Sequence, residues 1–201
     1  MSDSAIQFDA ATHTYTLGAL RLPSVTEALR PLSDAEYRGV AKDVMERAAA
    51  LGKAVHKLIE LDLRNDLDED TLSDALRPYL AQWRAFRTLS GFEAILSEQI
   101  VYSARYGYAG TLDLFGRLNG RLALIDAKRT AQVPRTAGPQ TAGYQLALCE
   151  SSPSAPWLAE PIDRYALHLT PDRWRLVPFK DGADQRVFLS ALTLHQWSKA
   201  A

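Results

Sequence analysis

The sequence predicts a mixed α/β fold in which a central sheet is flanked by helices. Apolar residues recur at three- and four-residue spacing in residues 40–63 and 70–89, a pattern typical of helices. Three apolar runs bounded by turn residues follow within residues 92–130, as expected for neighbouring strands. The chain has 201 residues, of which 47% are hydrophobic and 23% are charged. This size and composition fit a single globular domain over residues 1–201.

The first 35 residues predict a small appendage to this domain. Weak alternation around Gly18 indicates a β-hairpin, and a short helix should follow it. Ser24 is a good N-cap and Glu27 stands three residues later, which together form a capping box. We expect Pro31 to end this helix, because proline interrupts helical hydrogen bonding.

The remaining elements predict a three-stranded antiparallel meander with further strands and helices around it. The three strands are expected at 92–103, 108–118 and 121–130, and the last two are joined by Asn119-Gly120. Asn-Gly between apolar runs is the strongest short-range hairpin signal, because a type I′ turn needs positive φ at both positions. A helix over 140–150, a strand pair over 164–169 and 174–179, and a helix over 183–197 complete the order.

Bulk properties exclude several classes of protein. The net charge of −1 argues against general, non-specific coating of nucleic acid, although a local basic groove remains compatible with it. The single cysteine, Cys149, rules out an intramolecular disulfide and a cysteine zinc cluster, and favours a cytoplasmic location. No run reaches the length of a membrane helix, and the N-terminus lacks the pattern of a secretory signal.

Two aspartates on the predicted hairpin are the first sign of a functional site. With a two-residue turn at Asn119-Gly120, Asp113 falls directly opposite Asp126, with Cβ atoms about 5 Å apart. Lys128 projects from the same face, two residues further along the strand. Facing carboxylates repel unless one is protonated or a cation lies between them, and oxygen ligands favour Mg²⁺ or Mn²⁺. The alternative is a solvent-exposed pair with Lys128 as a salt-bridge partner.

Other polar residues are candidates for the same site. His56 and Glu60 share a helix face, so His56 could bind a metal while Glu60 orients it; each also has a purely structural interpretation. Glu98 interrupts the neighbouring strand and could support the metal ligands or mark a polar face. Gln140 and Tyr144 stand four apart on a helix and could orient Lys128 or a phosphate, or belong to a polar helix end and the core.

A basic set could line a groove for a nucleic-acid backbone, although an ordinary mixed surface would look similar. Its members are Lys53, Lys57, Arg105, Arg117, Arg129 and Arg135, with Tyr106 and Tyr108 among them.

These motifs resemble the PD-(D/E)XK nuclease superfamily, in particular its RecB-like and phage-exonuclease branch. The family pattern is a histidine on an early helix, Gly-x-x-Asp, Asp/Glu-x-Lys and Gln-x-x-x-Tyr. The matching positions here are His56, Gly110 with Asp113, Asp126 with Lys128, and Gln140 with Tyr144. The segment "LPSVTEAL" is similar to one in phage exonucleases and the mitochondrial genome maintenance exonuclease. The resemblance covers residues 22–148, and Arg129 departs from it, since many relatives have threonine or serine there.

The resemblance implies a restriction-endonuclease-like core and a metal-dependent DNA exonuclease of recombination, replication or repair, such as phages encode. It implies Mg²⁺ or Mn²⁺ held by His56, Asp113, Asp126 and the carbonyl of Ala127. Lys128 would position the attacking water, with Gln140 and Tyr144 in support, while Ser24 and Thr26 would contact a DNA phosphate. A single-strand annealing protein is a typical partner, and the resemblance leaves the oligomeric state open.

Two other functions fit the same residues. One is a non-catalytic DNA-binding module that keeps the nuclease fold, and the other is a small-molecule phosphoesterase. DNA binding that neither needs nor responds to a divalent metal would favour the first of these.

Overall fold

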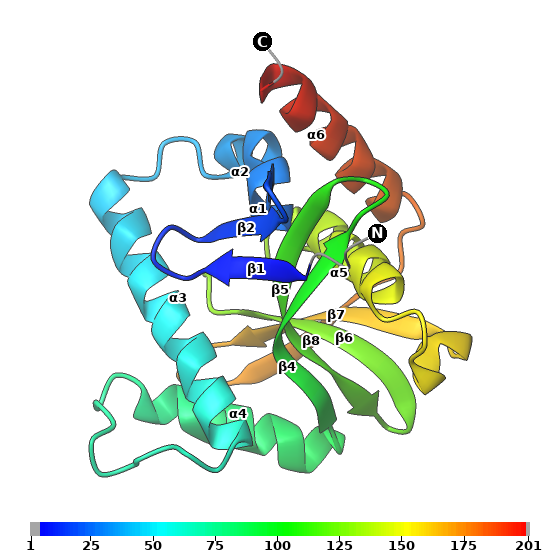
Figure 1. The fold of residues 1–201 in the computed structure, drawn as a ribbon. Helices are drawn as coiled ribbons and strands as arrows, with labels where there is room; N and C mark the ends of the chain where they lie inside the picture. Colours follow the sequence, from blue (N-terminus) through cyan, green and yellow to red (C-terminus); the bar gives the residue numbers. More distant parts are fainter. Residues whose placement is uncertain (1–4, 200–201) are drawn as a thin grey trace.

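The computed structural model describes residues 5–199, so residues 1–4 and 200–201 of the expected 1–201 domain lie outside the described part. Within it, a three-stranded sheet and a five-stranded sheet are flanked by helices (Figure 1). The small sheet contains β1 (Ile6–Asp9), β2 (Thr14–Leu17) and β3 (Leu20–Leu22). The large sheet contains β4 (Glu93–Ser103), β5 (Tyr108–Leu118), β6 (Arg121–Lys128), β7 (Ile162–Leu169) and β8 (Trp174–Phe179). The helices are α1 (Val25–Ala28), α2 (Arg30–Glu36), α3 (Lys42–Leu63), α4 (Arg77–Ser90), α5 (Ala137–Ser151) and α6 (Asp184–Lys199), with a short 3₁₀ helix at Pro156–Ala159.

The large sheet is mixed, which confirms the predicted fold class. Strands β4, β5 and β6 form the antiparallel meander, β7 runs parallel to β6, and β8 is antiparallel to β7. A parallel neighbour needs a long crossover connection, and α5 lies in the segment between β6 and β7. This crossover brings α5 back across the sheet, close to the end of β6.

The hairpin between β5 and β6 has the predicted turn and register. Asn119 and Gly120 have φ values of 50° and 79°, as a type I′ turn requires. Leu118 pairs with Arg121, and the same register continues outward to Leu114 and Ile125. Alternate side chains along β5 and β6 therefore lie on the same face of the sheet, as the sequence predicts.

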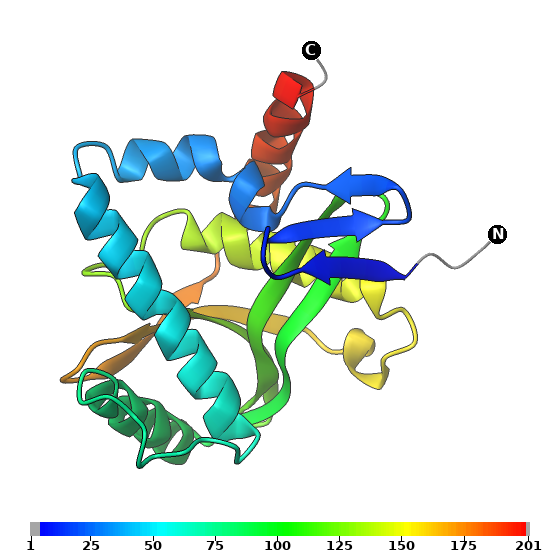
Figure 2. The ribbon, with the colours of Figure 1, turned by 60° about the vertical axis from the view of Figure 1, so that its left-hand side comes forward.

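Helices cover both faces of the large sheet (Figure 2). On one face, α3 and α4 pack through a core that includes Val55, Trp83, Phe86 and Ile125. On the other face, α1, α5 and α6 share a core with β4, β5 and β6. Trp83 is fully buried, and its indole nitrogen donates a 2.8 Å hydrogen bond to Oδ2 of Asp62 on α3. This bond ties α4 to α3 beneath the sheet.

Two helix boundaries differ from the prediction, and proline explains both. Helix α4 begins at Arg77 instead of residue 70, because Pro78 is tolerated in a first helical turn but not in a helix interior. Pro31 likewise does not end the first helix. It lies in the first turn of α2, after α1 has ended.

The small sheet packs against strand β5. The hydroxyl of Tyr15 on β2 lies 2.8 Å from that of Thr111 on β5, and Ser24 forms an isolated bridge with Ala109. The predicted capping box is present, since Ser24 accepts from the amide of Glu27 while Glu27 accepts from the amide of Ser24. The expected hairpin is thus the first part of a three-stranded sheet held next to the candidate site.

No helix among residues 5–199 is long and apolar enough to cross a membrane.

Candidate metal-binding and catalytic site

Three acidic residues occupy neighbouring cross-strand positions on three adjacent strands. Glu98 on β4 lies between the pairs Ser97–Leu114 and Gln99–Leu112, which places it across from Asp113 on β5. Continuing the register of the next hairpin places Asp126 on β6 across from the other side of Asp113. The sheet therefore carries a row of three carboxyl groups, which is costly without positive charge nearby.

Glu98 has an unusual backbone conformation. Its φ is 48°, in the left-handed region that non-glycine residues avoid, although regular pairs stand on both sides of it. Such a conformation costs about 1–3 kcal/mol and persists only where the surrounding structure enforces it, often at functional sites. The sequence assigned Glu98 a supporting role, whereas the structure places its carboxylate directly beside His56 and Asp113.

His56 supplies positive charge to this row from helix α3. Its Nδ1 lies 3.4 Å from Oδ1 of Asp113 and 3.6 Å from Oε1 of Glu98. Its Nε2 lies 3.2 Å from the carbonyl oxygen of Ala127, to which a protonated Nε2 donates. The Asp113 carboxylate beside it raises the pKa of His56 well above its usual value, despite opposing burial. In the neutral ring this arrangement leaves the Nδ1 lone pair directed at the carboxylates.

The donor set fits a divalent cation. His56, Glu98 and Asp113 each offer one ligand atom, and these atoms all lie within 4.8 Å of one another. One imidazole nitrogen with carboxylate oxygens suits first-row divalent ions, and carboxylates alone suit Mg²⁺ and Mn²⁺. The positive charge of a protonated His56 balances part of the negative charge of the carboxylates. A bound cation would balance the same negative charge at the same position.

Asp126 and Lys128 form a buried ion pair at the edge of this group. Lys128 Nζ lies 2.7 Å from Oδ2 of Asp126, whose side chain is 1% exposed. Lys128 is the partner of this buried Oδ2 among the described residues, and Oδ2 accepts no other hydrogen bond there. Burial raises the pKa of Asp126 to about 6, and the nearby Asp113 adds to the effect. Burial also opposes the charge on Lys128, but Asp126 and Asp113 outweigh it and raise the pKa of the ammonium group.

Helix α5 orients the lysine. Lys128 Nζ donates to Oε1 of Gln140 at 3.1 Å, and Nε2 of Gln140 donates to the hydroxyl of Tyr144 at 3.3 Å. Burial raises the pKa of Tyr144 well above its usual value, so this hydroxyl stays protonated. On the sheet side, the amide of Ala127 donates a 2.7 Å hydrogen bond to Oδ2 of Asp113 and fixes that carboxylate.

The lack of a side chain at Gly110 lets the ring of Tyr144 pack closely against β5. A Cβ atom at position 110 would lie 2.7 Å from Cε1 of Tyr144 and 3.2 Å from Cγ2 of Val25. We expect Gly110→Ala to lower the free energy of unfolding by about 1–3 kcal/mol, because both neighbours are held in the core. Thermal unfolding would measure this.

Gly52→Ala is the matched control for that variant. Gly52 lies in helix α3 with open space where its Cβ would stand, so alanine should stabilise the helix by up to about 1 kcal/mol. Equal melting temperatures for the two variants would contradict the close packing at Gly110.

The other predicted site residues have different partners or are exposed. Glu60 pairs with Lys57 at 2.9 Å and Arg64 at 2.8 Å, so it does not orient His56. Arg129 donates from Nη1 to the carbonyl of Ala48 at 2.6 Å and links β6 to α3. Ser24 is buried, and its hydroxyl already accepts a hydrogen bond in the capping box. Its side chain is therefore poorly placed to bind a DNA phosphate. Thr26, Lys53 and Arg135 are exposed.

Tyr37 is a neighbour of the site that no sequence motif marks. It caps the end of α2, and the preceding Glu36 accepts a 2.8 Å hydrogen bond from Thr136, one turn before Gln140. Burial raises the pKa of Tyr37, while the charge of Lys128 opposes the shift, which places its hydroxyl in the field of the lysine.

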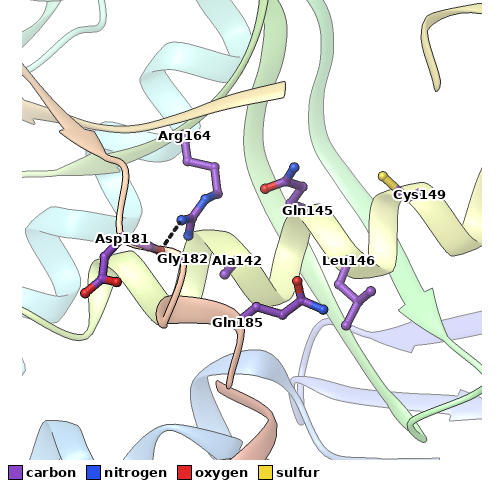
Figure 3. Close-up of a pocket in the computed structure, with 8 residues that line it drawn as sticks. All are labelled: Ala142, Gln145, Leu146, Cys149, Arg164, Asp181, Gly182 and Gln185. Carbon is purple, nitrogen blue, oxygen red and sulfur yellow. Dashed lines mark hydrogen bonds between the residues drawn. The ribbon is translucent and has the colours of Figure 1, made fainter. Parts of the chain in front are cut away.

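A separate pocket lies between α5, β7 and the start of α6 (Figure 3). Its volume is about 260 Å³, and Gln145, Cys149, Arg164 and Gln185 are among its lining residues. The guanidinium group of Arg164 already binds the carboxylate of Asp184 at 3.0 Å and backbone carbonyl oxygens. Among the described residues, the cluster of ligand atoms close enough to hold a metal lies at the sheet and not in this pocket.

Comparisons with known proteins find similarity in structure alone. No protein-family model matches the sequence, and no curated protein matches it. The crystal structure of SSO0001 is similar with a TM-score of 0.44 and 15% identity, over 87% of this chain and 75% of that chain. LHK-Exo, an alkaline exonuclease from Laribacter hongkongensis, gives a TM-score of 0.38 and 12% identity over 87% and 84% of the two chains. Its complex with dAMP gives 0.36 and 14% over 88% and 87%, so the solved structures similar to this chain include an exonuclease at low identity.

Proposed function

We propose that this protein is a metal-dependent deoxyribonuclease of the PD-(D/E)XK type, acting as an exonuclease at DNA ends. The observation that carries the proposal is the row of Glu98, Asp113 and Asp126 on adjacent strands, with His56 and Lys128 against it. A purely structural sheet has no reason to gather three acids side by side, one buried and two partly buried. Ligand oxygens for a divalent cation and a fixed ammonium group can together stabilise the charge that develops in phosphodiester hydrolysis.

Each residue has a distinct role in the proposal. His56, Glu98 and Asp113 hold Mg²⁺ or Mn²⁺, with Asp126 at the edge of the group. When bound, the cation polarises a phosphoryl oxygen and favours ionisation of a water molecule. Lys128 lies beside the acids and stabilises the negative charge that builds on the phosphate oxygens as the bond to the leaving oxygen breaks.

Supporting groups hold this machinery in place. Gln140 and Tyr144 keep Lys128 oriented toward the sheet, and the amide of Ala127 keeps Asp113 oriented. The carbonyl of Ala127 faces His56, so we assign it first to the orientation of the imidazole. The exposed Thr26, Lys53 and Arg135 remain candidates for DNA contacts, and a single-strand annealing protein remains a candidate partner in recombination or repair.

Cleavage of labelled linear DNA tests the proposal. We expect degradation with Mg²⁺ or Mn²⁺, none with EDTA, and at least a thousandfold loss of rate in Asp113→Asn, which removes a ligand charge from the centre. Asp163→Asn is the control, because Asp163 is also a strand aspartate but pairs with Arg121 at 2.8 Å on the surface. Equal degradation by the wild type and Asp113→Asn would reject the assignment, and metal-independent DNA binding without cleavage would favour the non-catalytic module.

The affinity for Mn²⁺ should rise with pH. The metal competes with the proton on His56, whose pKa is raised above its ordinary value of 6.5, so binding strengthens as pH rises through that higher value. Calorimetric titration between pH 6 and 9 would measure it. We expect His56→Gln to bind Mn²⁺ more weakly and with a flatter profile, and an equally steep profile in that variant would remove His56 from the site.

A further inference from the structure

A second cavity lies away from the acidic row, between the small sheet, helix α1 and the far end of helix α6. Its volume is about 490 Å³, within the range of small-molecule sites. Gln196 on α6 donates a 2.8 Å hydrogen bond to the carbonyl of Tyr106, which fixes the helix to the turn between β4 and β5. The cavity therefore has walls from three parts of the chain that are held together. Its lining residues are Leu20, Arg21, Leu22, Pro23, Glu27, Arg30, Gly107, His195, Gln196 and Lys199.

The charge of this lining is positive, in a protein whose net charge is −1. The lining contains three cations, Arg21, Arg30 and Lys199, and one carboxylate, Glu27. Glu27 is occupied, since one oxygen pairs with Arg21 at 3.2 Å and the other accepts from the amide of Ser24 at 2.9 Å. Among residues 5–199, no ion pair neutralises Arg30 or Lys199. These two cations are free to bind an anion.

The rest of the lining suits a ligand that also has an apolar, flat part. Leu20, which is 61% exposed, and Pro23 supply apolar surface above the buried Leu22, and His195 supplies a ring. A nucleotide combines a phosphate for the cations with a base for this surface. A simple inorganic anion would leave most of the volume unused.

The cavity lies at a fixed distance from the acidic row along one strand. Gly107 lines the cavity and directly precedes β5, and Asp113 stands six residues further along. At about 3.4 Å per residue the two are roughly 20 Å apart. The small sheet and α1 cover β5 between these two positions, so a strand must pass around them. A stacked strand rises about 3.4 Å per nucleotide, so about six or more stacked nucleotides are needed to join the two places.

We propose that this cavity binds a nucleotide unit of the DNA strand whose end lies at the metal site. Arg30 and Lys199 bind its phosphate, and the exposed Leu20 with Pro23 contacts its sugar or base. This proposal rests on the proposed nuclease function and adds to it a second contact that recognises strand length. A strand too short to reach the cavity should bind only at the metal site.

Fluorescence anisotropy with labelled oligothymidylates of 3 and 15 nucleotides in EDTA tests this, because cleavage is then prevented. We expect the 15-mer to bind wild-type protein at least tenfold more tightly than the 3-mer. Arg30→Gln/Lys199→Gln should remove most of that difference and lower the salt-dependence slope for the 15-mer by about 1 to 2. Arg173→Gln/Lys180→Gln is the control, since it removes two exposed cations at the two ends of β8, which do not line the cavity, and should change the affinity less than twofold.

The outcomes separate this site from the nuclease itself. Hydrolysis of bis(p-nitrophenyl) phosphate with Mn²⁺ uses a substrate too small to reach the cavity, so it should be unchanged in the double variant. Equal 15-mer binding by the wild type and the double variant would overturn the cavity proposal and leave the nuclease proposal standing. In a separate calorimetric titration, dTMP binding by the wild type but not by the double variant, with 15-mer binding unchanged, would overturn the strand contact in favour of a free-nucleotide site. Displacement of the 15-mer by hexaglutamate as effectively as by unlabelled 15-mer would overturn it in favour of an acidic peptide.

Discussion

Lys128→Gln should lower the rate of DNA hydrolysis by about a hundred- to a thousandfold, the usual cost of losing one fixed group that stabilises transition-state charge. Glutamine keeps the polar contact with Gln140 but removes the ammonium group that lies 2.7 Å from Asp126. Asp126, whose pKa is already raised to about 6, then loses its cation and stays protonated to higher pH. Initial rates on linear DNA at saturating Mn²⁺ would measure the loss, and it should fall on kcat more than on KM.

The control for this variant is Lys180→Gln, which removes an exposed lysine at the end of β8 and should keep the wild-type rate. Lys128→Gln should also keep its response to Mn²⁺ in thermal unfolding, because the three ligand atoms come from other residues. A rate within threefold of wild type would show that the ammonium group has no part in the chemistry. A complete loss of folded protein would be visible in the same unfolding scan.

The second large effect is stabilisation by metal. Mn²⁺ at a hundred times its dissociation constant should raise the free energy of unfolding by about 2.7 kcal/mol, because it binds the folded state. For a chain of 201 residues this corresponds to a rise in Tm of roughly 5–10 °C. We expect Glu98→Gln and Asp113→Asn to lose most of this shift, since each removes one charge from the ligand group.

Asp163→Asn should keep the full shift, because that carboxylate pairs with Arg121 on the surface. Glu98→Gln distinguishes a ligand from a bystander, since glutamine keeps the size of the side chain and leaves the backbone unchanged. An undiminished Mn²⁺ shift in Glu98→Gln would remove Glu98 from the ligands and leave the cation to His56, Asp113 and Asp126. An undiminished shift in both variants would place any metal elsewhere in the molecule.

The part of this site that local chemistry determines could be predicted from the sequence. Asn119-Gly120 selects one turn type, the turn selects the register, and the register places Asp113 and Asp126 at the same height. Lys128 follows by the alternation of side chains along a strand. None of these steps needs information about distant residues.

The part that depends on distant packing could not be predicted in the same way. Glu98 reaches the centre because the pairing of β4 shifts between Ala94 and Leu96 and because its own φ is positive. Neither feature has a signature in the residues around it. The predicted contact of Glu60 with His56 is absent among the described residues for a related reason. Glu60 shares a helix face with His56, but it pairs with Lys57 and Arg64 on that same helix. Periodicity shows which residues are neighbours, and competition among them decides the contacts.

Helix α3 is attached to the sheet through polar contacts at the very place where the cation would bind. His56 contacts acids on β4 and β5 and the carbonyl of Ala127 on β6, and Arg129 reaches back to Ala48 in the same helix. Closer to its start the helix exposes Val44 and Met45 and has little else to hold it. Its second half is held by the buried Val55, Leu58 and Ile59, so binding of the ion should act on the first half. Amide hydrogen exchange in that half should slow when the ion binds.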